Sequence, residues 1–138
     1  MRRQHWPALL ADELARGRAR PFQYGEHDCC LLAANVALAL TGRDPAATLR
    51  GRYKTRLGAQ RLIAAAGGLE QLAAQLAQAS GYAEIPPLLA QRGDAVLIET
   101  GGEVALGVID DAGRIACAGL HGLVYLPAAV GRRAWRVE

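Results

Sequence analysis

The sequence predicts an α+β domain in which helices come first and an antiparallel sheet comes last. Up to about residue 80, apolar residues recur at helical spacing, whereas from Asp94 onward short apolar runs alternate with turn residues. Strands so close together in the chain pair as an antiparallel meander, and helices packed on such a sheet form an α+β layer. With 138 residues, we expect one domain spanning residues 1–138.

The helical part should contain a buried central helix. Residues 29–40 are almost entirely apolar, which is typical of a helix covered on every side, and Asp28 is a suitable N-cap. Pro7 suits the first turn of an earlier helix, and Thr55 is placed to cap a later one. The expected helices span residues 6–16, 29–40, 44–49, 56–66 and 69–79.

About five short strands should follow. Glycine-containing turns separate apolar runs at residues 95–98, 104–109, 114–118, 123–126 and 134–137. Residues 85–87 should be extended, because a residue that precedes proline is biased away from the helix.

Composition argues against several classes of partner. Net charge is +3 and the arginines are scattered, without the dense basic stripe and interleaved aromatics of nucleic-acid binders. No apolar run reaches the roughly 18 residues of a membrane span, and the N-terminal segment does not read as a signal peptide. We therefore expect no nucleic-acid partner, no membrane insertion, and synthesis in a cytoplasm with the three cysteines reduced.

Cys29 is the candidate reactive residue. If Asp28 caps the central helix, Cys29 occupies the first helical position, where the helix dipole favours a thiolate and lowers the pKa. The alternative is a structural role, since cysteine is among the most buried residue types. Cys30 points about 100° away around the helix and is expected in the core.

Three short motifs resemble, in order and approximate spacing, those of NlpC/P60 cysteine peptidases, which have a papain-like fold. Tyr24-Gly25 followed by Asp28-Cys29-Cys30-Leu31-Leu32 is similar to the nucleophile motif of that family. Residues 92–98, Arg-Gly-Asp-Ala-Val-Leu-Ile, are similar to its Pro-Gly-Asp strand motif, and residues 105–109, Ala-Leu-Gly-Val-Ile, to its His-Val-Gly-Ile-Tyr strand. The resemblance covers about two thirds of the chain.

A wider pattern resembles a group of small phage and prophage proteins. It adds Arg-Gly-x-Tyr at residues 50–53, Gly-Ala-x-Arg at residues 58–61 and Ala-Trp-Arg-Val at residues 134–137. This resemblance implies a phage tail-tip or tail-assembly context, with other tail-tip proteins as partners and contact with peptidoglycan as an alternative. The protein would be made in the cytoplasm of a bacterial host and, once assembled, lie in the virion tail.

The resemblance also implies roles for individual residues. Cys29 takes the place of the nucleophile and Tyr24 that of a substrate-binding residue, while Asp28, Gly93 and Asp94 would support the site. The family's catalytic histidine is replaced by Ala105, so the domain is expected to be inactive and structural.

The alternative is an active endopeptidase or amidase that cleaves peptidoglycan stem peptides. His121, in a glycine turn between two late strands, would then be the base, and the amide of Cys29 or Cys30 would form the oxyanion hole. His27 is a weaker candidate base, and His5 is expected at the surface.

No metal or cofactor is expected. Adjacent cysteines rarely ligate one zinc ion together, and the Cys and His spacings do not match structural zinc sites. Asp94, before a strand, is more plausibly a turn-forming residue that bonds backbone amides than an acid catalyst.

Overall fold

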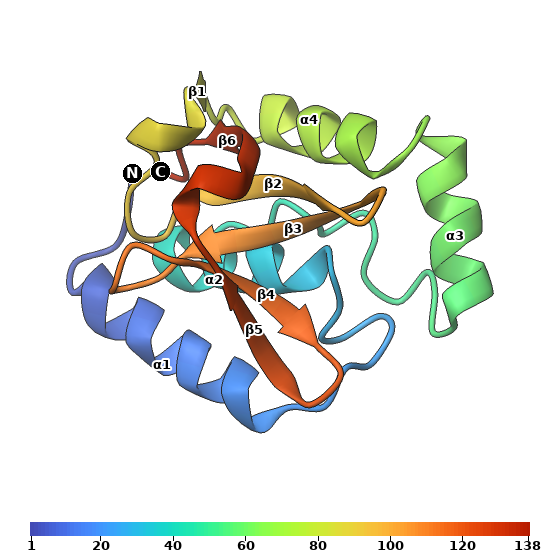
Figure 1. Ribbon diagram of the computed structural model, residues 1–138, viewed down its shortest axis with the longest axis horizontal. Helices are drawn as coiled ribbons and strands as arrows, with labels where there is room; N and C mark the ends of the chain where they lie inside the picture. The colour runs from blue at the N-terminus through green and yellow to red at the C-terminus, as the bar shows by residue number, and fades with distance from the viewer.

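A computed structural model describes all residues from Met1 to Glu138, and it is an α+β fold with helices on one side of an open sheet (Figure 1). The sequence-based assignment of the fold class is confirmed at this level. The helices are α1 (Trp6–Ala19), α2 (Leu31–Thr41), α3 (Arg56–Ala65) and α4 (Leu69–Ala79), with two 3₁₀ turns, η1 (Pro87–Leu89) and η2 (Ala128–Val130).

The sheet is antiparallel and its strand order is β1-β6-β2-β3-β4-β5. Its strands are β1 (Glu84–Ile85), β2 (Ala95–Thr100), β3 (Glu103–Ile109), β4 (Ile115–Gly119), β5 (Gly122–Leu126) and β6 (Gly131–Trp135). Strands β2 to β5 form the expected meander. The expectation of a simple meander is wrong for the last strand, because β6 returns to lie between β1 and β2.

Helices α1, α2 and α4 contact the sheet, whereas α3 stands at one end of the molecule (Figure 1). Helix α2 is the central one, with Leu31, Val36 and Leu40 fully buried. One stripe of α2 is open, however, since Leu38 is 37% exposed. Helix α3 buries only Ala59, so it is the least embedded helix.

The structure differs from the sequence-based assignment at two of the expected helices. Helix α1 continues past Arg16 to Ala19, because Gly17 lets it approach β5 closely: a Cβ atom at Gly17 would lie 3.1 Å from a methyl group of Leu123. Residues 44–49 form turns rather than a helix. The Asp44 carboxylate accepts hydrogen bonds from the Ala46 amide and from the Arg50 guanidinium, which folds the segment back on itself.

The start of α2 also differs from the expectation. Cys29 and Cys30 lie in a turn, and the helix begins at Leu31. The carbonyl of Cys29 accepts a hydrogen bond from the Leu106 amide of β3 at 3.1 Å, which holds this residue against the sheet and outside the helix.

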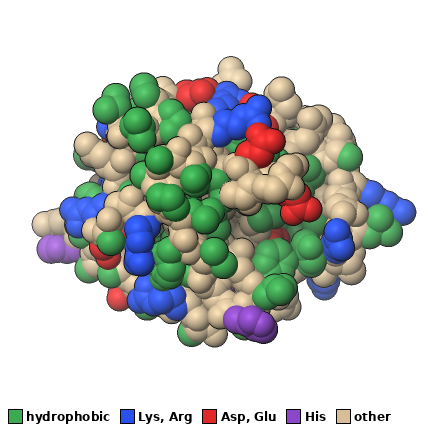
Figure 2. Space-filling view, in the orientation of Figure 1, with side chains coloured by type: hydrophobic (Ala, Val, Ile, Leu, Met, Phe, Trp, Pro, Cys, Tyr) green, Lys and Arg blue, Asp and Glu red, His purple; other side chains and the backbone are tan.

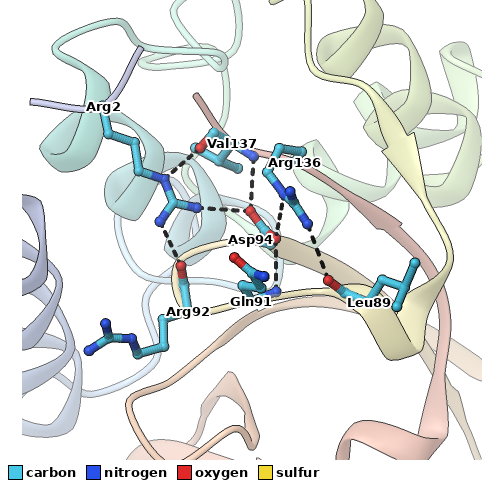
Figure 3. A network of polar contacts seen from close by, with 7 residues as sticks. All are labelled: Arg2, Leu89, Gln91, Arg92, Asp94, Arg136 and Val137. Carbon is cyan, nitrogen blue, oxygen red and sulfur yellow. Dashed lines mark hydrogen bonds and ion pairs between the residues drawn. The ribbon is translucent and has the colours of Figure 1, made fainter.

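A buried carboxylate joins the two ends of the chain (Figure 3). Asp94 is fully buried, and its oxygens accept hydrogen bonds from Arg2, Arg136 and the amides of Gln91 and Val137, at 2.9 to 3.1 Å. Asp94 thus bonds a turn amide as expected, and in addition it neutralises two arginines that come from opposite ends of the sequence.

Gly93, beside it, has φ of 88° and no room for a side chain. A Cβ atom there would lie 2.6 Å from a methyl group of Leu40. The Gly93-Asp94 pair therefore fixes the start of β2 against α2, and its role in this structure is architectural.

Candidate functional site

The candidate site is built around the turn that precedes α2. Strand β4 pairs with β3 only from Gly107 to Ile109, and the next amide along β3, that of Leu106, binds the carbonyl of Cys29 instead. Cys29 therefore lies where β4 parts from β3. The turn accepts the hydrogen bond from the Leu106 amide that β4 would have accepted if it had continued, so this amide of β3 stays satisfied.

Asp28 holds this turn in place. It is 1% exposed, and its carboxylate accepts four hydrogen bonds, from the amides of Gly25, Cys30 and Leu31 and from the Tyr53 hydroxyl. A carboxylate with this many donors is well compensated for its burial. It also places a negative charge at the N-terminus of α2 and occupies the amides that a developing anion would use.

The oxyanion hole expected from the sequence is therefore incomplete. The Cys30 amide donates to Asp28 Oδ1 at 3.0 Å, and the Leu31 amide donates to the same oxygen at 2.8 Å. Of the two amides expected to form the hole, only that of Cys29 is not bonded to Asp28.

Burial raises the pKa of Cys29 to about 11, and the charges of Asp28 and Glu103 act in the same direction. The expectation that the helix dipole lowers this pKa is thus wrong here. The thiol is half-buried, and the helix end is already neutralised by Asp28. Near neutral pH Cys29 is a protonated thiol.

The other two thiols have the same character. Burial raises the pKa of Cys30 to about 12 and that of Cys117 to about 11. The charge of Cys29 also contributes to the raised pKa of Cys117. All three cysteines are free.

A groove of about 190 Å³ opens beside Cys29. One wall is the turn before α2, with Tyr24; the opposite wall is α3, and Glu103 at the start of β3 stands at its edge. The residues that line it are Tyr24, Asp28, Cys29, Cys30, Tyr53, Arg56, Ala59, Gln60, Ile63 and Glu103. No histidine is among them.

The histidines lie elsewhere. His121 is exposed in the turn between β4 and β5. His27 is 1% exposed, its Nε2 lies 3.5 Å from the carbonyl oxygen of Gly122, and its Nδ1 has no partner. Its ring packs toward Gly17 of α1, away from the groove. His5 is exposed at the start of α1.

Ala105, which stands where the resemblance implies a histidine, is half-buried on β3. It packs against the apolar cluster that includes Cys117. Cys29, in contrast, packs against the cluster that contains Leu106, the next residue of β3.

Most residues of the groove were not identified from the sequence as site residues, among them Tyr53, Arg56 and Glu103. Tyr53 carried a signal, because it ends the Arg-Gly-x-Tyr pattern at residues 50–53. Arg56 and Glu103 carried none, since each reaches the groove only through the packing of α3 and the start of β3.

The structure places no group of three or more His, Cys, Asp or Glu side chains where they could hold a metal ion. None of its helices is both long and apolar enough to cross a lipid bilayer. On the face shown in Figure 2, basic side chains are dispersed among apolar and acidic ones.

The chain matches one family along nearly its whole length. The match covers residues 1–137, and the family is described as a domain of unknown function, DUF6950. No curated protein and no solved structure is detectably similar to the chain. The chain belongs to the DUF6950 family.

Proposed function

We propose that this protein is a non-catalytic component of a phage or prophage tail tip, or of its assembly, with a degenerate NlpC/P60-like fold. The observation that carries the absence of catalysis is the groove at Cys29: its thiol is held protonated and no histidine lines it. The tail-tip context and the papain-like ancestry rest on the sequence motifs that contain Cys29, Asp94 and Ala105.

The arrangement supports binding better than bond cleavage. An amide hydrolase with a cysteine nucleophile needs a base to take the thiol proton and an acid to protonate the leaving amine. It also needs donors for the oxyanion, and here Asp28 occupies the amides of Cys30 and Leu31. The groove nevertheless remains open, with Tyr24 on one wall.

The first experiment compares three versions of a phage or prophage that encodes this chain: wild type, a deletion, and Cys29→Ala. We expect the deletion to lose infectious particles and Cys29→Ala to keep a wild-type titre. Normal infectivity of the deletion would contradict the tail-tip role. A loss of titre in Cys29→Ala, with the protein folded, would favour the peptidase alternative.

The alternative has its own test. Purified protein, kept reduced, is incubated with peptidoglycan sacculi at several pH values, and released peptides are detected by mass spectrometry. We expect no release above that of Cys29→Ala. Release that depends on both Cys29 and His121 would establish an active cysteine peptidase.

A further inference from the structure

The groove beside Cys29 holds two opposite charges that have no partner in the protein. Arg56 lies on α3 and Glu103 lies at the start of β3, and both line the groove. Neither takes part in any ion pair of the chain. Neither side chain makes a hydrogen bond, whereas Arg50, nearby in the sequence, is bonded to Asp44 through two nitrogens.

Arg56 stands at an electrostatically unfavourable place. It is the first residue of α3, and no acidic residue lies in that first turn. The N-terminal end of a helix carries a partial positive charge, so a cation there is destabilising unless an anion offsets it. A carboxylate bound next to Arg56 would supply that anion.

The position of Arg56 is fixed by the packing of α3. A Cβ atom at Gly58 would lie 3.2 Å from Cβ of Tyr53, so the first turn of α3 rests against that tyrosine. The hydroxyl of Tyr53 is in turn bonded to Asp28 at 2.6 Å. This connection holds Arg56 at a set place relative to Cys29.

The Glu103 side of the groove favours a cation. The charges of Asp28 and Glu103 both act on the Cys29 thiol and raise its pKa. Asp28 is fully hydrogen-bonded, but Glu103 is exposed and free to accept. An ammonium group beside Glu103 and Cys29 would be stabilised by that carboxylate.

The size of the groove sets the size of the ligand. At about 190 Å³, it is smaller than the ~300–1,000 Å³ pockets that hold drug-sized molecules. The apolar side chains of Ala59 and Ile63 also line it. It therefore suits a group of about one or two amino-acid residues.

We propose that the groove binds a small dipolar ligand, a free amino acid or a dipeptide, with its carboxylate on Arg56 and its ammonium on Glu103. This rests on the proposed function only in treating the groove as a binding site rather than a catalytic one. A free amino acid and a dipeptide both carry an ammonium and a carboxylate group, and the test distinguishes between these two ligands.

The test uses the whole, reduced protein labelled with ¹⁵N. Alanine and dialanine are titrated, together with N-acetylalanine, which lacks the ammonium, and alaninamide, which lacks the carboxylate. We expect amide shifts at Cys29, Gln60 and Glu103, and at least about tenfold weaker binding of both blocked compounds, since a hydrogen bond to a charged group contributes about 1.5–3 kcal/mol. A stronger response to alanine or to dialanine identifies the source.

Two variants show which residue binds the carboxylate of the ligand and which binds its ammonium group. Arg56→Glu should lose the preference for a carboxylate and bind alaninamide at least as well as alanine, whereas Glu103→Gln should lose the preference for an ammonium. Arg61→Glu, on the exposed side of the same helix, is the matched control and should bind as wild type does. Arg56→Gln replaces Arg56→Glu if the latter unfolds.

Absence of any shift with both dipolar compounds would overturn the inference, as would equal binding of the blocked ones or an equal effect of Arg61→Glu. None of these outcomes bears on infectivity, so this inference and the proposed function fail separately.

Discussion

The hydroxyl of Tyr53 donates a 2.6 Å hydrogen bond to Oδ2 of Asp28, across 25 positions of sequence. This bond joins the loop after α2 to the turn before it, and both segments form walls of the groove at Cys29. The tyrosine is buried, so water does not compete for the carboxylate.

Tyr53→Phe should therefore lower the free energy of unfolding by about 1.5–3 kcal/mol, the usual contribution of a hydrogen bond to a charged group. Urea denaturation measures the change. Tyr125→Phe is the control, because the Tyr125 hydroxyl makes no hydrogen bond. The contact of the Arg114 guanidinium with the aromatic ring, 4.0 Å from the ring centre, is kept in phenylalanine. A Tyr53→Phe loss no larger than that of the control would show that the bond contributes little.

The Cys29 thiol should be unreactive near neutral pH. A rise in pKa from 9.0 to about 11 lowers the thiolate fraction by about 100-fold. Alkylation by iodoacetamide at pH 7.5, followed by peptide mass spectrometry, should be much slower at Cys29 than in glutathione. Glu103→Gln should speed it, because one of the charges that disfavour the thiolate is removed. Alkylation faster than that of glutathione would contradict this account.

Stability should fall in alkaline solution. The folded protein holds the protons of Cys29, Cys30 and Cys117 to a pKa of about 11 to 12, whereas the unfolded chain releases them near 9.0. Above pH 9 the unfolded state binds fewer protons, so the free energy of unfolding decreases as pH rises toward 12. The pKa of Tyr53 is also raised, by burial and by Asp28, and adds to this loss.

The measurement is urea denaturation under reducing conditions between pH 7 and 11. Cys117→Ala should show a shallower decline than wild type, since one of the shifted groups is removed. A stability that stays constant or rises across this range would refute the prediction.

Asp94→Asn should be strongly destabilising, by about 3–5 kcal/mol, because it leaves Arg2 and Arg136 beside a neutral group in a buried place. Thermal and urea unfolding measure the loss. Asp111→Asn is the matched control. Its ion pair with Arg92 is 3.8 Å long and about half-exposed, so its removal should cost less than about 1 kcal/mol.

Ala105→His tests the resemblance to NlpC/P60 peptidases. If position 105 is that of the family's histidine, an imidazole there should stabilise the Cys29 thiolate and raise its alkylation rate at pH 7 by at least about tenfold. Leu88→His is the control, because Leu88 is exposed in η1 and does not line the groove at Cys29. An unchanged rate in Ala105→His would count against the resemblance at this position.

The sequence was sufficient for features determined by neighbouring residues. Thr55 caps α3 as expected, with its hydroxyl accepting from the Gly58 amide at 3.1 Å, and the turns between β2 and β5 fall where glycines predicted them. What it could not supply was long-range pairing. Strand β6 lies beside β2, and Asp94 meets Arg2 and Arg136, through contacts between distant segments.

At the Cys29 site, too, the local feature was predicted correctly and the effect of distant residues was not. Asp28 was expected to cap the following helix, and it does bind two of the first amides. The effect on the thiol was predicted with the wrong sign, because that effect depends on burial under tertiary contacts and on Glu103 from β3. A single sequence shows the helix end but not the charges that other strands bring to it.

The hydrogen bonds that Asp94 accepts from Arg2, Arg136 and Val137 have a mechanical consequence. The chain ends lie side by side (Figure 1), and Arg2 Nε also bonds the Val137 carbonyl at 2.7 Å. Tension applied to the two ends would load these few contacts first and peel them one after another, instead of shearing the sheet along its strands. If the domain were pulled from both ends, the contacts of Arg2 with Asp94 and Val137 would break at low force while β2 to β5 stayed folded.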